Sequence, residues 1–196
     1  MDNESAKKTK KMVGVAIFIA VIVVLQVIST FVKFGSFSIT MALAPIVVGA
    51  AVYGTSAGLM LGASMGIVVL GGCISGLDPG GALLWAANPP LTAFLCVFKS
   101  AAAGYAAGLV YKLLSKKNSY AGVFCAAMVC PVVNTGIFVA ALTLFYKSLL
   151  YEWAGETSVI YFLFVIIVGT NFILEFAVNA ALAPGIARVI KITEKV

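Results

Sequence analysis

The chain has 196 residues, of which 62% are hydrophobic and 10% are charged, and its formal net charge is +6 at pH 7. Soluble domains are about half apolar and a quarter charged, so this composition indicates an integral membrane protein and excludes a sizeable soluble domain. Histidine is absent from the sequence, which excludes His-based catalytic triads, HExxH zinc sites and His-ligated haem.

Two further observations narrow the function. The sequence has no GxxxxGK[ST] phosphate-binding loop, so any energy from ATP has to come from a partner. Its four cysteines, Cys73, Cys96, Cys125 and Cys130, form no CxxC pair and are interpreted as small core residues. We therefore expect a protein that is not an enzyme and that binds neither a metal nor a cofactor.

Hydrophobic runs predict an all-α, polytopic membrane protein with six transmembrane helices. The basic segment 1–11 precedes the first apolar run, 12–32, which is long enough to cross a hydrocarbon core of about 30 Å and longer than the apolar part of a signal peptide. The other five helices are predicted at 36–53, 55–71, 90–114, 120–146 and 158–190. The membrane domain then covers 12–190, and a short tail, 191–196, follows it.

The basic residues are distributed unevenly over the predicted loops. With the N-terminus inside, ten of the thirteen Lys and Arg residues fall on the inner side, and only Lys33 and Lys147 fall on the outer side. This positive-inside bias predicts that both termini are cytoplasmic and that the two long loops, 72–88 and 147–157, face outside. The net charge is thereby explained by topology, and no nucleic-acid partner is expected.

Glycines recur at every fourth position in the second half of the stretch 36–66: Gly54, Gly58, Gly62 and Gly66. That spacing stacks four bare positions on one helix face, where a neighbouring backbone can approach closely. The pattern predicts a packing face between two helices of the membrane domain.

Two charged residues, Lys99 and Glu175, lie within predicted spans, where an ionised side chain is costly and indicates a functional site. Lys99 lies about 13 Å below the outer end of its helix, and Glu175 lies about 25 Å from the outer face, at 1.5 Å per residue. One interpretation is a structural ion pair between them. The other is that Lys99 has no permanent partner and receives an anion, and the sequence leaves both open.

Two amides lie near Lys99 in depth. Asn134 follows Pro131 in the fifth predicted helix, roughly 9 Å below the outer surface, and Asn171 is somewhat deeper in the sixth. A single buried Asn is usually an interhelical contact, but a Lys with two amides indicates a polar pocket that opens outward.

The outer loop 72–88 carries Trp85 in an apolar segment and ends at Asn88. Trp85 is expected either to lie in the interfacial belt or to fold over the pocket, and Asn88 is a further candidate hydrogen-bonding residue.

Together these features resemble the substrate-binding S component of an energy-coupling factor (ECF) vitamin transporter. The resemblance rests on the pair Ala16 and Ala20 in the first helix, on the stretch SITMALAPIVVGAAVYGTSAGLMLG, and on the phrase CPVVNTGIF in the fifth helix. It covers most of the chain. The second-helix stretch and NTGIF look most like the pantothenate-type members of the family.

The resemblance implies a division of labour in a bacterial plasma membrane. The S component captures a vitamin at its outer face, and a membrane-embedded T component and two cytoplasmic ATPase subunits drive its release inside. By analogy with the family, Ala16 and Ala20 dock on the T component, and the ligand contacts come from the region of Trp85, Lys99, Asn134 and Asn171. Pantothenate carries one carboxylate that matches Lys99, and its hydroxyls and amide would use Asn134, Asn171 and Asn88.

A second function class stays open at this point. A stand-alone, proton-coupled secondary transporter of a small anionic solute would use Glu175 as its proton carrier. Dependence on a proton gradient without ATPase partners would distinguish it from the S component.

Overall fold

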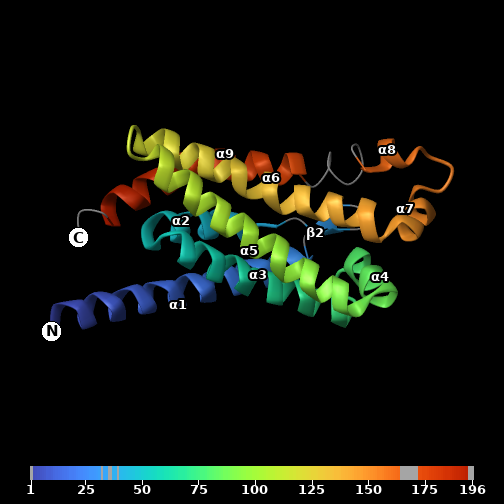
Figure 1. Ribbon diagram of the computed structural model, residues 1–196, viewed down its shortest axis with the longest axis horizontal. Helices are drawn as coiled ribbons and strands as arrows, with labels where there is room; N and C mark the ends of the chain where they lie inside the picture. Colours follow the sequence, from blue (N-terminus) through green and yellow to red (C-terminus); the bar gives the residue numbers. More distant parts are fainter. Residues whose placement is uncertain (1, 32, 35–36, 39, 164–171, 194–196) are drawn as a thin grey trace.

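The computed structural model describes residues 2–31, 33–34, 37–38, 40–163 and 172–193. These residues form an elongated helical bundle with both chain ends at one end and the short helices α4, α7 and α8 at the other (Figure 1). The elements are α1 (Asp2–Phe31), β1 (Lys33–Phe34), β2 (Phe37–Ser38), α2 (Leu43–Tyr53), α3 (Thr55–Ser75), α4 (Pro79–Ala87), α5 (Pro89–Leu114), α6 (Ser119–Phe145), α7 (Lys147–Ala154), α8 (Val159–Tyr161) and α9 (Ile173–Thr193). The predicted all-α class is confirmed, with one two-stranded hairpin added to it.

Four helices in the described part of the chain are long and apolar enough to cross a membrane. They are Glu4–Phe31 within α1, Thr55–Ser75, Pro89–Leu114 and Ser119–Phe145. Helix α2 has 11 residues and is therefore only about 16 Å long at 1.5 Å per residue, half the thickness of a hydrocarbon core. Part of the sixth predicted span, 164–171, lies outside the described residues, so the count of six spans stays a prediction.

The predicted helix 36–53 is wrong in its first third. Helix α2 begins only at Leu43, and residues 33–34 and 37–38 before it form two antiparallel strands in which Phe34 pairs with Phe37. Aromatic residues favour strands, and Pro45 belongs in a first helical turn, where its missing N–H costs no hydrogen bond. Apolar content alone did not reveal this boundary.

The two loops predicted to face outside, 72–88 and 147–157, contain more helix than predicted. Helix α3 continues to Ser75 and ends at Gly76, whose φ of +75° is a left-handed conformation that favours glycine. Helix α4 then starts at Pro79, with Asp78 at its N-cap position. The Asp-Pro pair that predicts a turn is equally a helix start, because proline suits the first helical position. Most of the second loop forms α7.

The spaced glycines divide into two groups. Gly54 is the turn between α2 and α3, with a φ of +92°, and a Cβ there would meet no atom within 4 Å. At Gly58, Gly62 and Gly66 a Cβ would instead collide with backbone carbonyl oxygens of α5. The predicted packing face is thus confirmed for these three glycines, which face Gly104, Ser100 and Cys96, respectively.

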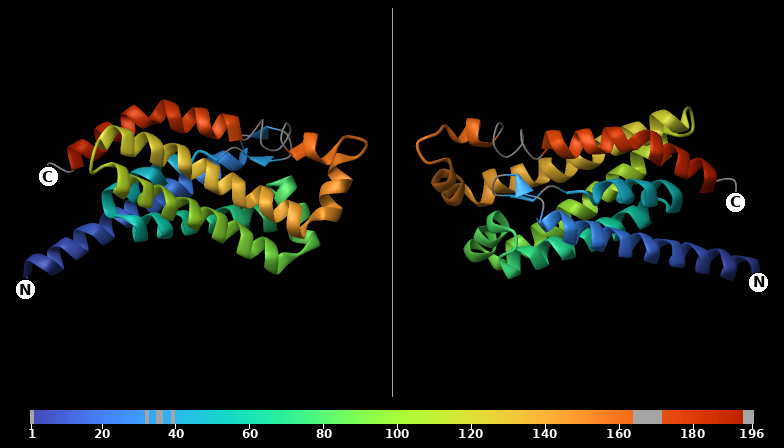
Figure 2. Two further views of the ribbon diagram at one scale, coloured as in Figure 1. Left: turned by 45° about the horizontal axis from the view of Figure 1, so that its top comes forward. Right: turned by 180° about the vertical axis from the view of Figure 1, so that it is seen from behind.

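Two apolar clusters fill the interior of the bundle. The larger one surrounds α2 and includes Ile22, Ile46 and Leu61, all fully buried. The smaller one, nearer α4 and α7, is centred on Leu142 and Tyr146. Figure 2 shows from two further sides that the helices enclose this interior along their length. A polar cavity borders both clusters.

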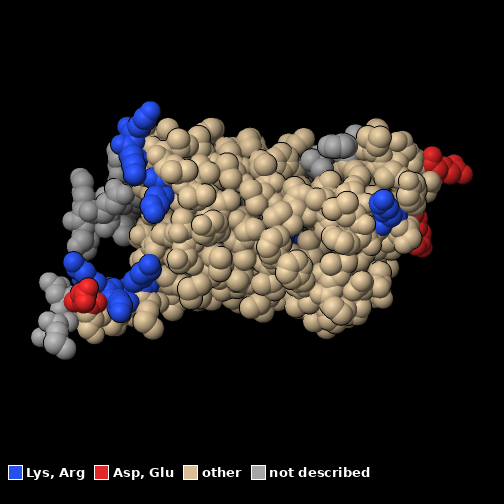
Figure 3. All heavy atoms as spheres, in the orientation of Figure 1, with Lys and Arg blue, Asp and Glu red and all other residues tan. Residues whose placement is uncertain are grey.

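Basic side chains are concentrated at one end of the bundle. Lys and Arg gather at the end that carries both termini, with an acidic group among them, whereas acidic groups appear beside a basic one at the opposite end, near α7 (Figure 3). The basic end includes exposed lysines of α1 and of the turn between α5 and α6: Lys7, Lys8, Lys10, Lys11, Lys116 and Lys117. The sides of the bundle between the two ends are almost free of charge in this view.

Candidate functional site

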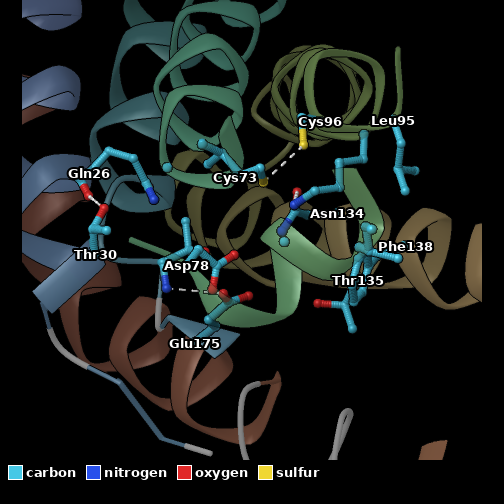
Figure 4. Close-up of a pocket in the computed structure, with 16 residues that line it drawn as sticks. Gln26, Thr30, Cys73, Asp78, Leu95, Cys96, Asn134, Thr135, Phe138 and Glu175 are labelled. Carbon is cyan, nitrogen blue, oxygen red and sulfur yellow. Dashed lines mark hydrogen bonds between the residues drawn. The ribbon is translucent and has the colours of Figure 1, made fainter. Parts of the chain in front are cut away.

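A cavity of about 90 Å³ lies among α1, α3, α4, α5, α6 and α9 (Figure 4). Its volume exceeds that of a single water site, which needs roughly 10–15 Å³ by the same measure. The cavity is lined by Gln26, Thr30, Thr40, Val69, Gly72, Cys73, Asp78, Gly81, Leu84, Leu95, Cys96, Lys99, Asn134, Thr135, Phe138 and Glu175. Two of the residues predicted from the sequence, Lys99 and Asn134, are therefore on its wall.

Lys99 reaches the cavity from α5 and is partly buried. Its Nζ donates a hydrogen bond of 3.3 Å to Asn134 Oδ1 on α6, and it lies 5.6 Å from the centroid of the Phe138 ring. An amide oxygen and an aromatic face both favour a cation, but neither carries a full negative charge. The positive charge of Lys99 is therefore stabilised without being neutralised by these two groups.

Glu175 reaches the same cavity from α9 and is only 4% exposed. Its Oε1 accepts a hydrogen bond of 3.1 Å from the backbone N–H of Thr40, and its Oε2 has no hydrogen-bond partner. Within the described residues, no nitrogen–oxygen contact of 4.0 Å or less joins Lys99 to Glu175. The structural ion pair, one of the two interpretations of the sequence, is thus not formed.

Gln26 of α1 is a cavity residue that the sequence analysis missed. Its side chain is 4% exposed, lines the cavity, and leaves Oε1 without a hydrogen-bond partner. A glutamine inside a long apolar run was the available signal, because buried amides in spans form contacts between helices or with ligands. Two more residues on the wall carried no such signal: Thr40, near the start of the predicted helix 36–53, and Asp78, in the predicted loop 72–88.

The cavity also contains a pair of thiols. Cys73 Sγ of α3 and Cys96 Sγ of α5 are 3.9 Å apart, and both cysteines are free and buried. Within the described residues, no group of three or more His, Cys, Asp or Glu side chains is arranged to hold a metal ion.

The two other predicted ligand residues within the described part of the chain, Asn88 and Trp85, are not among those lining the cavity. Asn88 is exposed and caps α5, with its Oδ1 accepting a hydrogen bond of 3.2 Å from the Leu91 N–H. Trp85 lies on α4 and is partly buried, while its neighbour Leu84 lines the cavity. Asn171 lies outside the described residues.

Ala16 and Ala20 are exposed and lie near the middle of α1. Exposed apolar side chains surround them on the same helix, namely Val13, Ile17 and Val24. This surface is free of contacts with the rest of the described bundle and is apolar enough to face lipid or another membrane protein.

Long apolar helices define a multi-pass membrane protein, and a cavity lined by both polar and apolar side chains lies among them. A family model described as "ECF transporter, substrate-specific component" matches residues 10–187, so the chain belongs to this family. A search of curated proteins found no match.

Membership of this family makes the chain the substrate-specific subunit of an ECF transporter. Its role is transport and substrate binding, and the family implies association with a T component and ATPase subunits in the membrane. The resemblance drawn from the sequence is confirmed at this level.

Proposed function

We propose that the cavity binds a water-soluble vitamin with one negative charge, pantothenate being the best candidate, for ATP-driven uptake by the partner subunits. The observation that carries this proposal is the environment of Lys99, a cation between helices whose contacts are an amide oxygen and a ring face. A single carboxylate would neutralise it with a charge-assisted hydrogen bond.

The proposal includes a topology of six spans with both termini cytoplasmic. The concentration of Lys and Arg at the terminal end of the bundle supports it, since basic residues are enriched on the cytoplasmic side (Figure 3). In this orientation α4 and α7 are outside, and the cavity, which α4 helps to line, is reached from the outer surface.

Pantothenate suits the cavity chemistry as well as its charge. Its amide and hydroxyl groups require donors and acceptors, and the wall provides amides from Gln26 and Asn134 and the carboxyl group of Glu175. The preference for pantothenate over other anionic vitamins rests on the resemblance of the second-helix stretch and of NTGIF.

We further propose that Ala16 and Ala20 dock on the T component. Both are exposed, and small residues four apart on a membrane helix allow a second helix to approach closely.

A binding measurement with lysine variants tests the site. Titration calorimetry of the purified protein should show that Lys99→Ala weakens pantothenate binding about tenfold or more, because charge-assisted hydrogen bonds contribute roughly 1.5–3 kcal/mol. Lys99→Arg should restore only part of the affinity, since its planar fork differs from an ammonium. Lys147→Ala, which removes an exposed lysine of α7, is the matched control and should bind like the parent.

A double variant tests the rival view that Lys99 only balances Glu175. Lys99→Met with Glu175→Gln removes both charges, so it would bind like the parent if the two residues were merely a structural pair. We expect it to bind at least as weakly as Lys99→Ala, because Glu175 also lines the cavity. Parent-like affinity would remove Lys99 from the site.

The stand-alone secondary transporter is not favoured, because the chain belongs to a family of ECF subunits. Uptake driven by a proton gradient in vesicles containing this protein alone would revive that alternative.

A further inference from the structure

The buried hydrogen-bond acceptors on the cavity wall include Glu175 Oε2 on α9 and Gln26 Oε1 on α1, and neither atom has a donor. Each of the two side chains is only 4% exposed. A polar atom that is buried without a hydrogen bond destabilises the folded protein, so nearly all such atoms in proteins have a partner. Two unsatisfied acceptors around one cavity indicate that a bound molecule supplies the missing donors.

Three donors on the wall bond to other acceptors. The Lys99 ammonium donates to Asn134 Oδ1, the Thr30 hydroxyl donates to the Gln26 backbone carbonyl over 3.0 Å, and the Thr40 N–H donates to the other oxygen of Glu175. Gln26 Oε1 and Glu175 Oε2 therefore stay unsatisfied with these donors in place.

The cation and the two acceptors belong to different walls. Lys99 and Asn134 extend from α5 and α6, whereas Gln26 and Glu175 extend from α1 and α9. Figure 4 shows Gln26 and Asn134 on opposite sides of the cavity, with Glu175 below them. A molecule between these walls meets a cationic side and a side that accepts hydrogen bonds.

We infer that the substrate is a bifunctional acid, with a carboxylate at one end and hydroxyl or amine donors at the other. The inference rests on the proposed function for its carboxylate end, which binds Lys99. At the other end the donors satisfy Glu175 Oε2 and Gln26 Oε1. The same arrangement selects against acids of equal size that lack donors, because such acids leave two acceptors buried and unpaired.

The test compares three probes on the full-length protein by titration calorimetry. They are pantothenate, its analogue without the two hydroxyls, and an analogue with an ammonium group at that end. The parent should bind the hydroxyl-free analogue about tenfold or more weakly than pantothenate. The ammonium analogue separates the two donor types, since binding tighter than that of pantothenate identifies an amine as the natural donor.

Variants connect this selectivity to the two acceptors. Gln26→Met and Glu175→Gln should each reduce the preference for pantothenate over the hydroxyl-free analogue. They should lower the affinity for pantothenate and leave the affinity for the analogue unchanged. Asn179→Leu is the matched control, because Asn179 is 1% exposed on α9, also has an unpaired oxygen and does not line the cavity. It should keep the full preference even if its melting temperature falls. If Glu175→Gln does not fold, Gln26→Met carries the test.

Three results would overturn the inference while leaving the proposed function standing. They are equal affinity of the parent for pantothenate and its hydroxyl-free analogue, an undiminished preference in Gln26→Met, and the same loss of preference in Asn179→Leu.

If no probe binds, pantothenate is the wrong vitamin, and melting temperatures are then measured with pairs of carboxylic acids that differ only in a hydroxyl or amine. Stabilisation of the protein by the donor-bearing acids alone supports the inference. Equal stabilisation by the donor-free acids, or no stabilisation by any of the acids, overturns it.

Discussion

Lys99 of α5 donates a hydrogen bond of 3.3 Å to Asn134 of α6 across the wall of the cavity. The amide oxygen orients the ammonium group but carries no net charge, so this contact does not neutralise Lys99. Glu175, on the wall of the same cavity, accepts a hydrogen bond from the Thr40 backbone instead of forming an ion pair with Lys99. The cavity therefore has a cation available to an anionic ligand.

This relationship predicts the effect of Asn134→Asp. A carboxylate at this position would neutralise Lys99 and compete with the ligand, so anion binding should weaken about tenfold or more. Removal of one partner from a buried interaction leaves the other unsatisfied, so Asn134→Leu should lower the melting temperature, whereas Asn134→Asp should keep or raise it. Calorimetry and thermal unfolding of both variants measure these effects. Unchanged affinity in Asn134→Asp would show that the ligand does not contact Lys99.

Close packing between α3 and α5 predicts a contrast between two glycines of α3. At Gly62 an added Cβ would collide with the Ser100 carbonyl, whereas at Gly71 it would meet nothing within 4 Å. Gly62→Ala should therefore destabilise the protein by about 1–3 kcal/mol, as overpacking does. Gly71→Ala should be neutral or stabilising by up to about 1 kcal/mol, because alanine favours helix. Thermal unfolding in detergent compares them, and equal melting temperatures would contradict the packing.

The exposed side of α1 predicts a variant that assembles poorly but still binds its substrate. Ala16→Trp with Ala20→Trp should prevent co-purification with the T component, because a bulky pair blocks close helix approach. Ligand binding by the isolated protein should survive, since neither alanine lines the cavity. Leu113→Trp, at an exposed apolar position of α5, is the control and should assemble normally. A double variant that assembles and transports like the parent would assign docking to another surface.

The proposed orientation predicts which side of the membrane two serines face. Ser75 ends α3 near α4, and Ser119 begins α6 at the opposite end of the bundle (Figure 1). Single cysteines are introduced at these positions in a protein without the four native cysteines, and intact cells are treated with an impermeant thiol reagent. The cysteine at position 75 should be labelled, and the cysteine at position 119 should not. Labelling of the Ser119 site instead would invert the topology.

Two residues of the candidate site could be predicted from the sequence, from the charge of a side chain and from its depth in the membrane. Lys99 was identifiable because a lysine within a span is rare, and the depth of Asn134, counted along its helix, placed it at a similar level. The structure brings these two residues together. Gln26 was missed because the apolar run around it was read only as a span.

Other features of the fold and the site could not be predicted from local sequence patterns, because the same residues fit more than one local structure. Asn88 has the side chain of a ligand-binding residue but caps α5, which depends on where that helix starts. The sequence Asp78-Pro79 fits both a turn and a helix start, and the structure has the helix. The hairpin that pairs Phe34 with Phe37 lies in an apolar stretch where composition favoured a helix.

The most direct test of the central claim is mass spectrometry of the small molecule that co-purifies with the protein. The account predicts an acid with one carboxylate, pantothenate in the best case, bound by the parent and lost or strongly depleted in Lys99→Ala. A cationic or uncharged molecule, or an acid retained equally by Lys99→Ala, would contradict it.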